Sequence, residues 1–137
     1  MKTINATKGE LVNMINGLFS VQELKGKEFS LAVGKNISII RDSLKDVEEA
    51  GKPSEEFMEL AQEVNNIANE SKEDSKEQID ALEKENEELV KSRREQMDSV
   101  NKMMDASIEI ELHPLTEEFL PEDITAKQIN SIIKLIK

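Results

Sequence analysis

The spacing of its apolar residues favours a mainly helical fold for this chain. A first set recurs at intervals of three and four residues and comprises Leu11, Met14, Ile15, Leu18 and Val21. This is the period of one helix face, and Thr7 with Glu10 forms a capping box before it. A second set runs from Phe29 to Val47 and stops before the Gly51-Lys52-Pro53 sequence, whose Gly and Pro are typical helix stop signals. The first 53 residues therefore predict two helices.

The middle of the chain predicts a long acidic helical region from residue 54 to residue 106. Ser54 is a predicted N-cap, and no apolar residue occurs between Asn69 and Gln78. We expect a turn there rather than one continuous helix, because Ser75 and Gln78 have the spacing of another capping box. From residue 79 to residue 103 the apolar spacing follows a heptad, which is typical of a coiled coil.

The last thirty residues combine a strand pattern with a short helix pattern. Ile108, Ile110 and Leu112 alternate with glutamates, which predicts a half-exposed strand. A single strand is not stable, so it needs either the 2–6 segment or a second chain as its partner. Thr125 with Gln128 predicts the start of a last helix.

These patterns predict a mainly α fold: an antiparallel helical bundle or hairpin with a long acidic helical arm and a minor β element near the termini. We expect a single domain, 1–137, made of a helical hairpin (1–53), the acidic region (54–106) and a strand with the C-terminal helix (107–137). The chain has no Cys, Trp or Tyr, and hydrophobic residues make up 37% of it against 34% charged residues. Such a composition gives a small core, so we expect a homo-oligomer.

The net charge of −11 is unevenly distributed along the chain. Residues 1–41 carry six basic and three acidic side chains, whereas residues 55–95 carry six basic and 14 acidic ones. This excess of carboxylates disfavours binding to nucleic acid or to anionic membranes. It would suit a basic protein partner, although a solvated helix face with i,i+4 ion pairs would have the same composition. We expect a cytoplasmic protein, because the sequence has neither a signal peptide nor an apolar run of membrane-spanning length.

Two groups of residues are candidate binding sites. Lys35, Asn36 and Arg41 could hold a small anionic ligand, with cations for its charge and an amide for a polar edge. Asn36 could instead specify the register of its helix against a neighbouring helix through buried hydrogen bonds. The second group is a candidate protein interface on the heptad and its acidic flank, and it comprises Leu82, Leu89, Val100, Met103, Glu83, Glu87 and Glu88.

No pattern of catalytic or metal-binding residues is present. The single histidine, His113, has no second imidazole or thiolate with which to bind a metal. Glu87 and Glu88 are adjacent on a helix and diverge, so they cannot easily share a proton. We expect a protein that is not an enzyme and uses no cofactor.

Two segments resemble a group of phage proteins. Residues 9–50 read GELVNMINGLFSVQELKGKEFSLAVGKNISIIRDSLKDVEEA, and residues 108–136 read IEIELHPLTEEFLPEDITAKQINSIIKLI. Together they resemble small bacteriophage-encoded, mainly helical proteins of unknown function, over about half of the chain. The resemblance implies a phage accessory protein in the host cytoplasm or associated with the virion. It carries over no catalytic residue.

We therefore expect a non-catalytic phage accessory protein that binds and inhibits or sequesters a host defence component. A virion-assembly or tail-associated helical adaptor is an alternative. A further alternative is an oligomeric sponge for a small anionic nucleotide signal, held by Lys35, Asn36 and Arg41 between two subunits.

Overall fold

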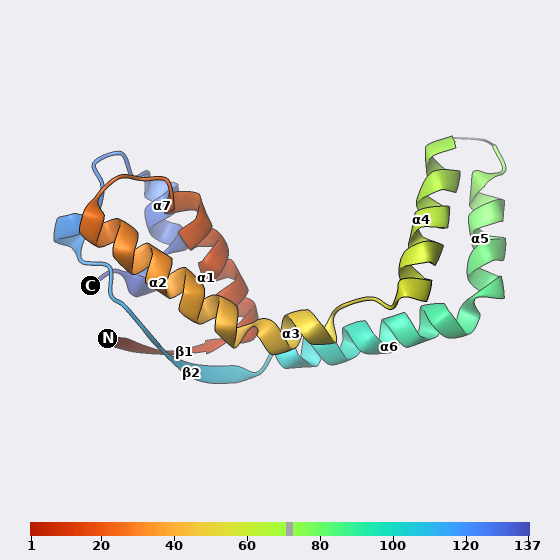
Figure 1. The fold of residues 1–137 in the computed structure, drawn as a ribbon, viewed down its shortest axis with the longest axis horizontal. Helices are drawn as coiled ribbons and strands as arrows, with labels where there is room; N and C mark the ends of the chain where they lie inside the picture. The colour runs from red at the N-terminus through yellow and green to blue at the C-terminus, as the bar shows by residue number, and fades with distance from the viewer. Residues whose placement is uncertain (71–72) are drawn as a thin grey trace. The chain divides into compact units, whose positions relative to one another are not determined.

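The computed structural model describes residues 1–70 and 73–137, which divide into two compact units. The first unit contains Met1–Val47 and Lys102–Lys137, and the second contains Glu48–Asn101. Figure 1 labels the elements of both units. The described residues form seven α-helices and one two-stranded antiparallel sheet, which confirms the predicted mainly α fold with a minor β element.

The two ends of the chain meet in the sheet of the first unit. β1 (Lys2–Thr7) pairs with β2 (Ser107–Leu112), and Ile4 lies opposite Ile110 (Figure 1). Both isoleucines are buried against the helices, while the alternate positions Thr3 and Glu109 are exposed. The alternation predicted for residues 108–112 is confirmed, and the strand's partner is the segment at the N-terminus.

α1 (Lys8–Val21) begins at the predicted capping box. Thr7 Oγ1 accepts a hydrogen bond from Glu10 N at 3.1 Å, and Glu10 Oε1 accepts one from Thr7 N at 3.4 Å. Further along α1, a Cβ added to Gly17 would lie 2.7 Å from the backbone oxygen of Ser131. Glycine at this position therefore allows α1 to pack closely against the C-terminal segment.

The second predicted helix is divided in two. α2 (Lys27–Ser43) follows a turn at Gly26, whose φ of 135° favours glycine, and α3 (Lys45–Ala50) begins after Leu44. The sequence predicted one apolar stripe through to Val47. Ser43 Oγ donates to Ile39 O at 3.1 Å just before the break, and such bonds to the preceding turn bend helices.

The C-terminal segment folds back beside the end of β2. It contains two short 3₁₀ helices, η1 (Glu117–Phe119) and η2 (Ile133–Leu135), and between them α7 (Ala126–Ser131). The predicted box of Thr125 and Gln128 caps α7, and this helix ends at Ser131. Leu115 N donates to Leu135 O at 2.8 Å, so the last residues are fastened to the segment after β2.

The core of the first unit brings together side chains from the sheet, α1, α2 and the C-terminal segment. Its buried apolar residues are Ile4, Ala6, Leu11, Met14, Ile15, Leu18, Val21, Phe29, Val33, Ile37, Ile40, Ile110, Leu112, Leu115, Ile132 and Leu135. The two predicted helical sets and the strand at 108–112 all contribute to it.

In the second unit, α4 (Glu55–Glu70) packs against α5 (Ser75–Glu85). Ser54 Oγ accepts from Phe57 N at 3.1 Å, as expected of the predicted cap. The helices end and restart within residues 69–78, where we expected a turn, although residues 71–72 of that interval lie outside the described ones. The second expected box is wrong, because Asp74 is the N-cap and accepts a hydrogen bond from the side chain of Gln78.

The uninterrupted heptad predicted for residues 79–103 is also wrong. α5 ends at Glu85 and α6 (Glu87–Met104) begins two residues later, with Asn86 between them at φ −110°. The Asn86 amide donates to Leu82 O at 2.9 Å and so caps the end of α5. The apolar positions before and after Asn86 therefore belong to two different helices.

Candidate functional site

The acidic charge of the protein is concentrated in the second unit. Residues 48–101 carry 17 acidic and seven basic side chains, a net charge of −10, whereas the first unit carries 12 acidic and 11 basic ones, a net charge of −1. No carboxylate of α5 or α6 forms an ion pair with another described residue. Among the described residues, the glutamates and aspartates of α5 and α6 therefore do not form the i,i+4 ion pairs that a solvated helix face could have.

The helical hairpin of α4 and α5 has few buried side chains. Leu60 is the buried residue of α4, and none is buried in the described part of α5. The half-buried apolar residues of the two helices are Phe57, Val64, Ile67, Ile79 and Leu82. The hairpin therefore has only a small buried core of its own.

A groove on α4 brings two leucines together with three carboxylates. Glu56, Glu59 and Glu63 lie at i, i+3 and i+7 on α4 and line a space of about 270 Å³ together with Leu60 and Leu89. A lysine or arginine could rest its aliphatic stem on the half-buried Leu89 and place its charged group among the carboxylates.

The loop before α4 is held by two polar side chains of α6. Arg93 donates to Gly51 O and to Gln96 Oε1, each at 2.8 Å, and Gln96 donates to Ala50 O at 2.8 Å. The Arg93 guanidinium also lies 5.5 Å from the centre of the Phe57 ring, within cation–π range. These contacts fix the start of α4 and with it the position of the groove carboxylates.

The predicted protein-interface residues do not form one seam. Leu82 lies on α5 and Leu89 on α6, and both are half-buried. Val100 is buried and Met103 is half-buried, but they fall in different units. The carboxylates of the group, Glu83, Glu87 and Glu88, are exposed.

Asn36 forms the buried hydrogen bonds expected of a structural amide, but its partner is the backbone of His113 rather than a neighbouring helix. Its side chain is fully buried, its Nδ2 donates to His113 O at 2.8 Å, and its Oδ1 accepts from His113 N at 2.7 Å. The amide thus pairs with the backbone as a neighbouring strand would, and it fastens α2 to the residue that follows β2.

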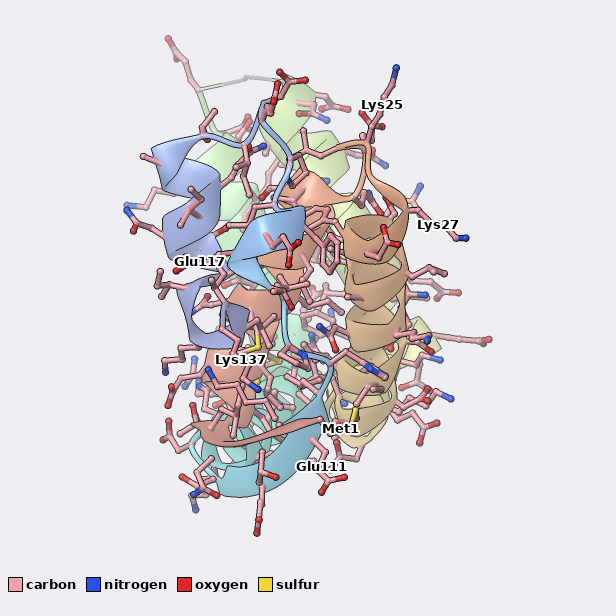
Figure 2. The ribbon with its side chains drawn as sticks, turned by 90° about the vertical axis from the view of Figure 1, so that its left-hand side faces the viewer. Met1, Lys25, Lys27, Glu111, Glu117 and Lys137 are labelled. Carbon is pink, nitrogen blue, oxygen red and sulfur yellow. The ribbon has the colours of Figure 1, made fainter. Side chains whose placement is uncertain are left out.

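Lys35 and Arg41 do not join Asn36 in one site. Both cations are exposed, and the Arg41 guanidinium lies 5.9 Å from the centre of the Phe19 ring. Figure 2 shows Lys25 and Lys27 extending away from the turn before α2. The basic residues near α2 are therefore spread over its exposed surface.

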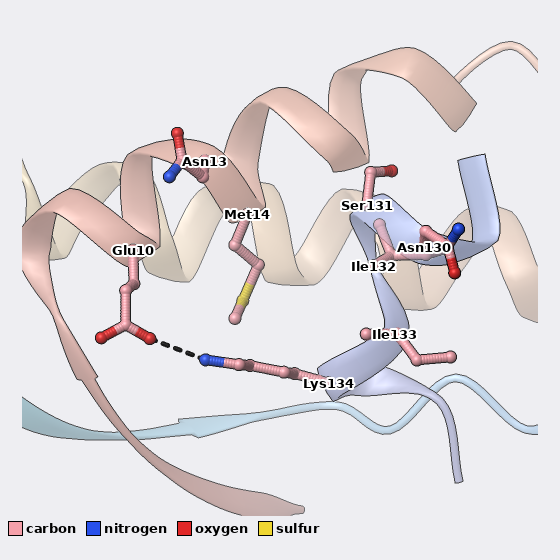
Figure 3. A pocket seen from close by; sticks show the side chains of 8 residues that line it. All are labelled: Glu10, Asn13, Met14, Asn130, Ser131, Ile132, Ile133 and Lys134. Carbon is pink, nitrogen blue, oxygen red and sulfur yellow. Dashed lines mark hydrogen bonds and ion pairs between the residues drawn. The ribbon is translucent and has the colours of Figure 1, made fainter. Parts of the chain in front are cut away.

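A second hollow lies between α1 and the C-terminal segment (Figure 3). It encloses about 180 Å³ and is lined by Glu10, Asn13, Met14, Asn130, Ser131, Ile132, Ile133 and Lys134. Lys134 Nζ donates to Glu10 Oε2 at 2.6 Å, and Figure 3 shows Met14 pointing into the space beside this ion pair. The hollow thus has an apolar side and a charged rim.

Two carboxylates of the first unit have lowered pKa values. The hydrogen bond from Lys134 is the largest cause of the lowered pKa of Glu10, and the backbone of Thr7 adds to it. The hydrogen bond from Lys8 lowers the pKa of Asp46. Both carboxylates are exposed, so these ion pairs contribute little to stability.

The described residues contain no cluster of three or more His, Cys, Asp or Glu side chains suited to a metal ion. In the same part of the chain, no helix is long and apolar enough to cross a membrane.

The roles of Arg93 and Gln96 could not be predicted from the sequence. A charged residue within the apolar spacing of residues 79–103 was the available signal for Arg93. Arg93 bonds Gly51 O and Gln96 bonds Ala50 O, and these carbonyl groups lie more than 40 residues earlier, where no local spacing identifies them.

Comparison with known proteins leaves the family open. No protein-family model matches the chain, and no curated protein or solved structure matches it either.

Proposed function

We propose that this protein acts by binding a basic protein segment through its second unit, residues 48–101. The observation that carries the proposal is the division of charge: −10 of the total −11 lies on these helices. Such a field attracts a basic partner and accelerates the encounter. The groove adds a local concentration of carboxylates for the same partner, because Glu56, Glu59 and Glu63 line it beside Leu89.

The resemblance to small phage proteins directs the second half of the proposal. The bound partner is a host protein, and binding blocks or sequesters it. This half rests on the resemblance alone, whereas the basic character of the partner rests on the charge of the second unit.

A pair of charge-reversed variants tests the proposal. The first variant combines Glu56→Lys, Glu59→Lys and Glu63→Lys in the groove. The matched control makes the same change in net charge at exposed residues of the first unit, with Glu117→Lys, Glu118→Lys and Glu122→Lys. Each tagged protein is used to capture partners from a bacterial lysate, and the affinity of a recovered partner is then measured.

The groove variant should bind a recovered partner at least about tenfold more weakly, because three lost charge contacts of roughly 0.5 kcal/mol each sum to about 1.5 kcal/mol. The control should bind as the wild type does. Added salt should weaken wild-type binding, since the screening length falls from about 10 Å at 0.1 M to about 3 Å at 1 M. Equal binding by all three proteins, or equal loss in both variants, would contradict a site in the groove. Recovery of phage structural proteins from infected cells would instead support the adaptor alternative.

A further inference from the structure

The register of the sheet shows which backbone groups of β1 face away from β2. Lys8 N donates to Ala106 O at 3.2 Å, which continues the register of the two strands. Hydrogen-bonded pairs recur at every second residue of an antiparallel pair, so Ala6, Ile4 and Lys2 bond β2. The backbone groups of Thr3, Asn5 and Thr7 must then point outward. Glu10 confirms this direction, because its carboxylate accepts a hydrogen bond from Thr7 N on the side away from β2.

The outer edge of β1 is open at Thr3 and Asn5. Among the described residues, none donates to or accepts from the outward backbone groups of these two. Their side chains are exposed. An edge of this kind is a template for another strand.

The edge of β2 is unsuited to pairing with its own copy. By the same register, Ser107, Glu109 and Glu111 carry its outward groups. Two such edges would bring exposed glutamates close together across the new strand pair, and like charges there are destabilising. From Lys2 to Thr7, β1 carries no acidic side chain.

The charge of each unit also favours the first unit for self-association. A second copy meets a net charge of −1 there, against −10 on residues 48–101. Two copies therefore repel each other least at surfaces of the first unit.

The hollow of Figure 3 lies beside the same edge. Glu10 and Lys134, which line it, each contact an end of β1: Glu10 bonds Thr7 N, and Lys134 O accepts from Lys2 Nζ at 2.7 Å. Ile133, at its apolar side, is 54% exposed. A strand added to β1 would direct every second side chain toward this face.

We propose that a second copy of this chain adds its β1 antiparallel to β1, so that a four-stranded sheet of order β2-β1-β1-β2 forms around a two-fold axis. Centred on Ile4, the pairing places Thr3 of each copy opposite Asn5 of the other, and each of these pairs exchanges two backbone hydrogen bonds. Lys2 of the second copy then lies opposite Ala6, next to Glu10. The ion pair of Glu10 with Lys134 is exposed and can rearrange at low cost. This interface uses no residue of the acidic unit, so it stands independently of the proposed function.

A proline pair tests the edge. Asn5 and Glu109 face each other in the sheet, and both point their N–H groups outward. Asn5→Pro and Glu109→Pro therefore leave the bonds between β1 and β2 intact, but only the first blocks the proposed interface. Light scattering after size exclusion, over a range of concentrations, should give the wild type and Glu109→Pro twice the 15.5 kDa chain mass. Asn5→Pro should remain at the single-chain mass.

Amide hydrogen exchange of the wild type decides the matter even if Asn5→Pro does not fold. The amides of Thr3 and Asn5 should be protected, increasingly so at higher concentration, while those of Glu109 and Glu111 exchange freely. A monomer mass at every concentration would overturn the proposal, as would protection at Glu109 and Glu111 instead. A dimer that persists in folded Asn5→Pro would also overturn it and return the interface to Leu82 and Leu89.

Discussion

Replacement of Asn36 by alanine should destabilise the first unit by about 2–4 kcal/mol. The substitution removes both hydrogen bonds to His113 and leaves that residue's backbone N–H and C=O without their partner. Each unsatisfied buried group costs roughly 1–3 kcal/mol. The lower half of that range applies, since His113 is half-buried and water can replace part of what is lost.

Urea unfolding measures this free energy. The chain has no Trp or Tyr, so unfolding is best followed by circular dichroism, together with NMR signals of β2 that report on the first unit alone. Lys35→Ala, a change at the exposed neighbouring position, is the control and should stay within about 0.5 kcal/mol of the wild type. An Asn36→Ala protein as stable as Lys35→Ala would show that the hydrogen bonds of Asn36 to His113 do not stabilise the first unit.

Three further predictions concern packing, a loop and pH. Gly17→Ala should destabilise the first unit by about 1–3 kcal/mol, because the added methyl group meets the backbone of the C-terminal segment. Gly34→Ala has open space around it and should stabilise α2 by roughly 0.5–1 kcal/mol. Thermal melts compare the two variants. Arg93→Met should free the carbonyl group of Gly51 and loosen the loop before α4, so that amide hydrogen exchange in residues 50–54 becomes faster while that of β2 is unchanged. The lowered pKa of Glu10 adds a small stability above its unfolded pKa that is lost as the pH falls. Glu10→Gln should therefore slightly flatten the melting temperature profile between about pH 5 and about pH 3, and a steeper profile in the variant would contradict the ion pair with Lys134.

The helix starts could be predicted because their signals are local. The capping boxes of α1 and α7 each need a hydroxyl and a carboxyl or amide three residues apart, and both boxes form as the spacing indicates. The same rule failed at Ser75, where Asp74 lies one residue earlier and provides the cap position instead. A capping pattern therefore locates a helix start to within about a turn, but not its N-cap residue.

The interruption at Asn86 could not be predicted from apolar spacing. The heptad continues across this position, and no glycine or proline marks it. The Asn86 amide competes with the backbone for the carbonyl group of Leu82, as side-chain amides do at helix ends. A polar residue within the apolar spacing here ends a helix.

The hydrogen-bond partners of inward-facing polar side chains were the hardest part of the site to predict from the sequence. Asn36 was identified as a buried amide from its place on the helix face, but its partner, His113, lies 77 residues later. Arg93 likewise bonds a carbonyl group 42 residues earlier. Periodicity shows that such a side chain faces inward, and only the folded chain shows which backbone group it meets.

The charges can be counted in the sequence, but only the fold shows how they divide between the two units. Once residues 102–137 are seen to belong with the N-terminal helices, the first unit is almost neutral and the second holds nearly all of the net charge. A surface that attracts basic proteins repels its own copy for the same electrostatic reason. Self-association and partner binding therefore require separate surfaces in this protein, and the open edge of β1 with the groove on α4 provides one of each kind.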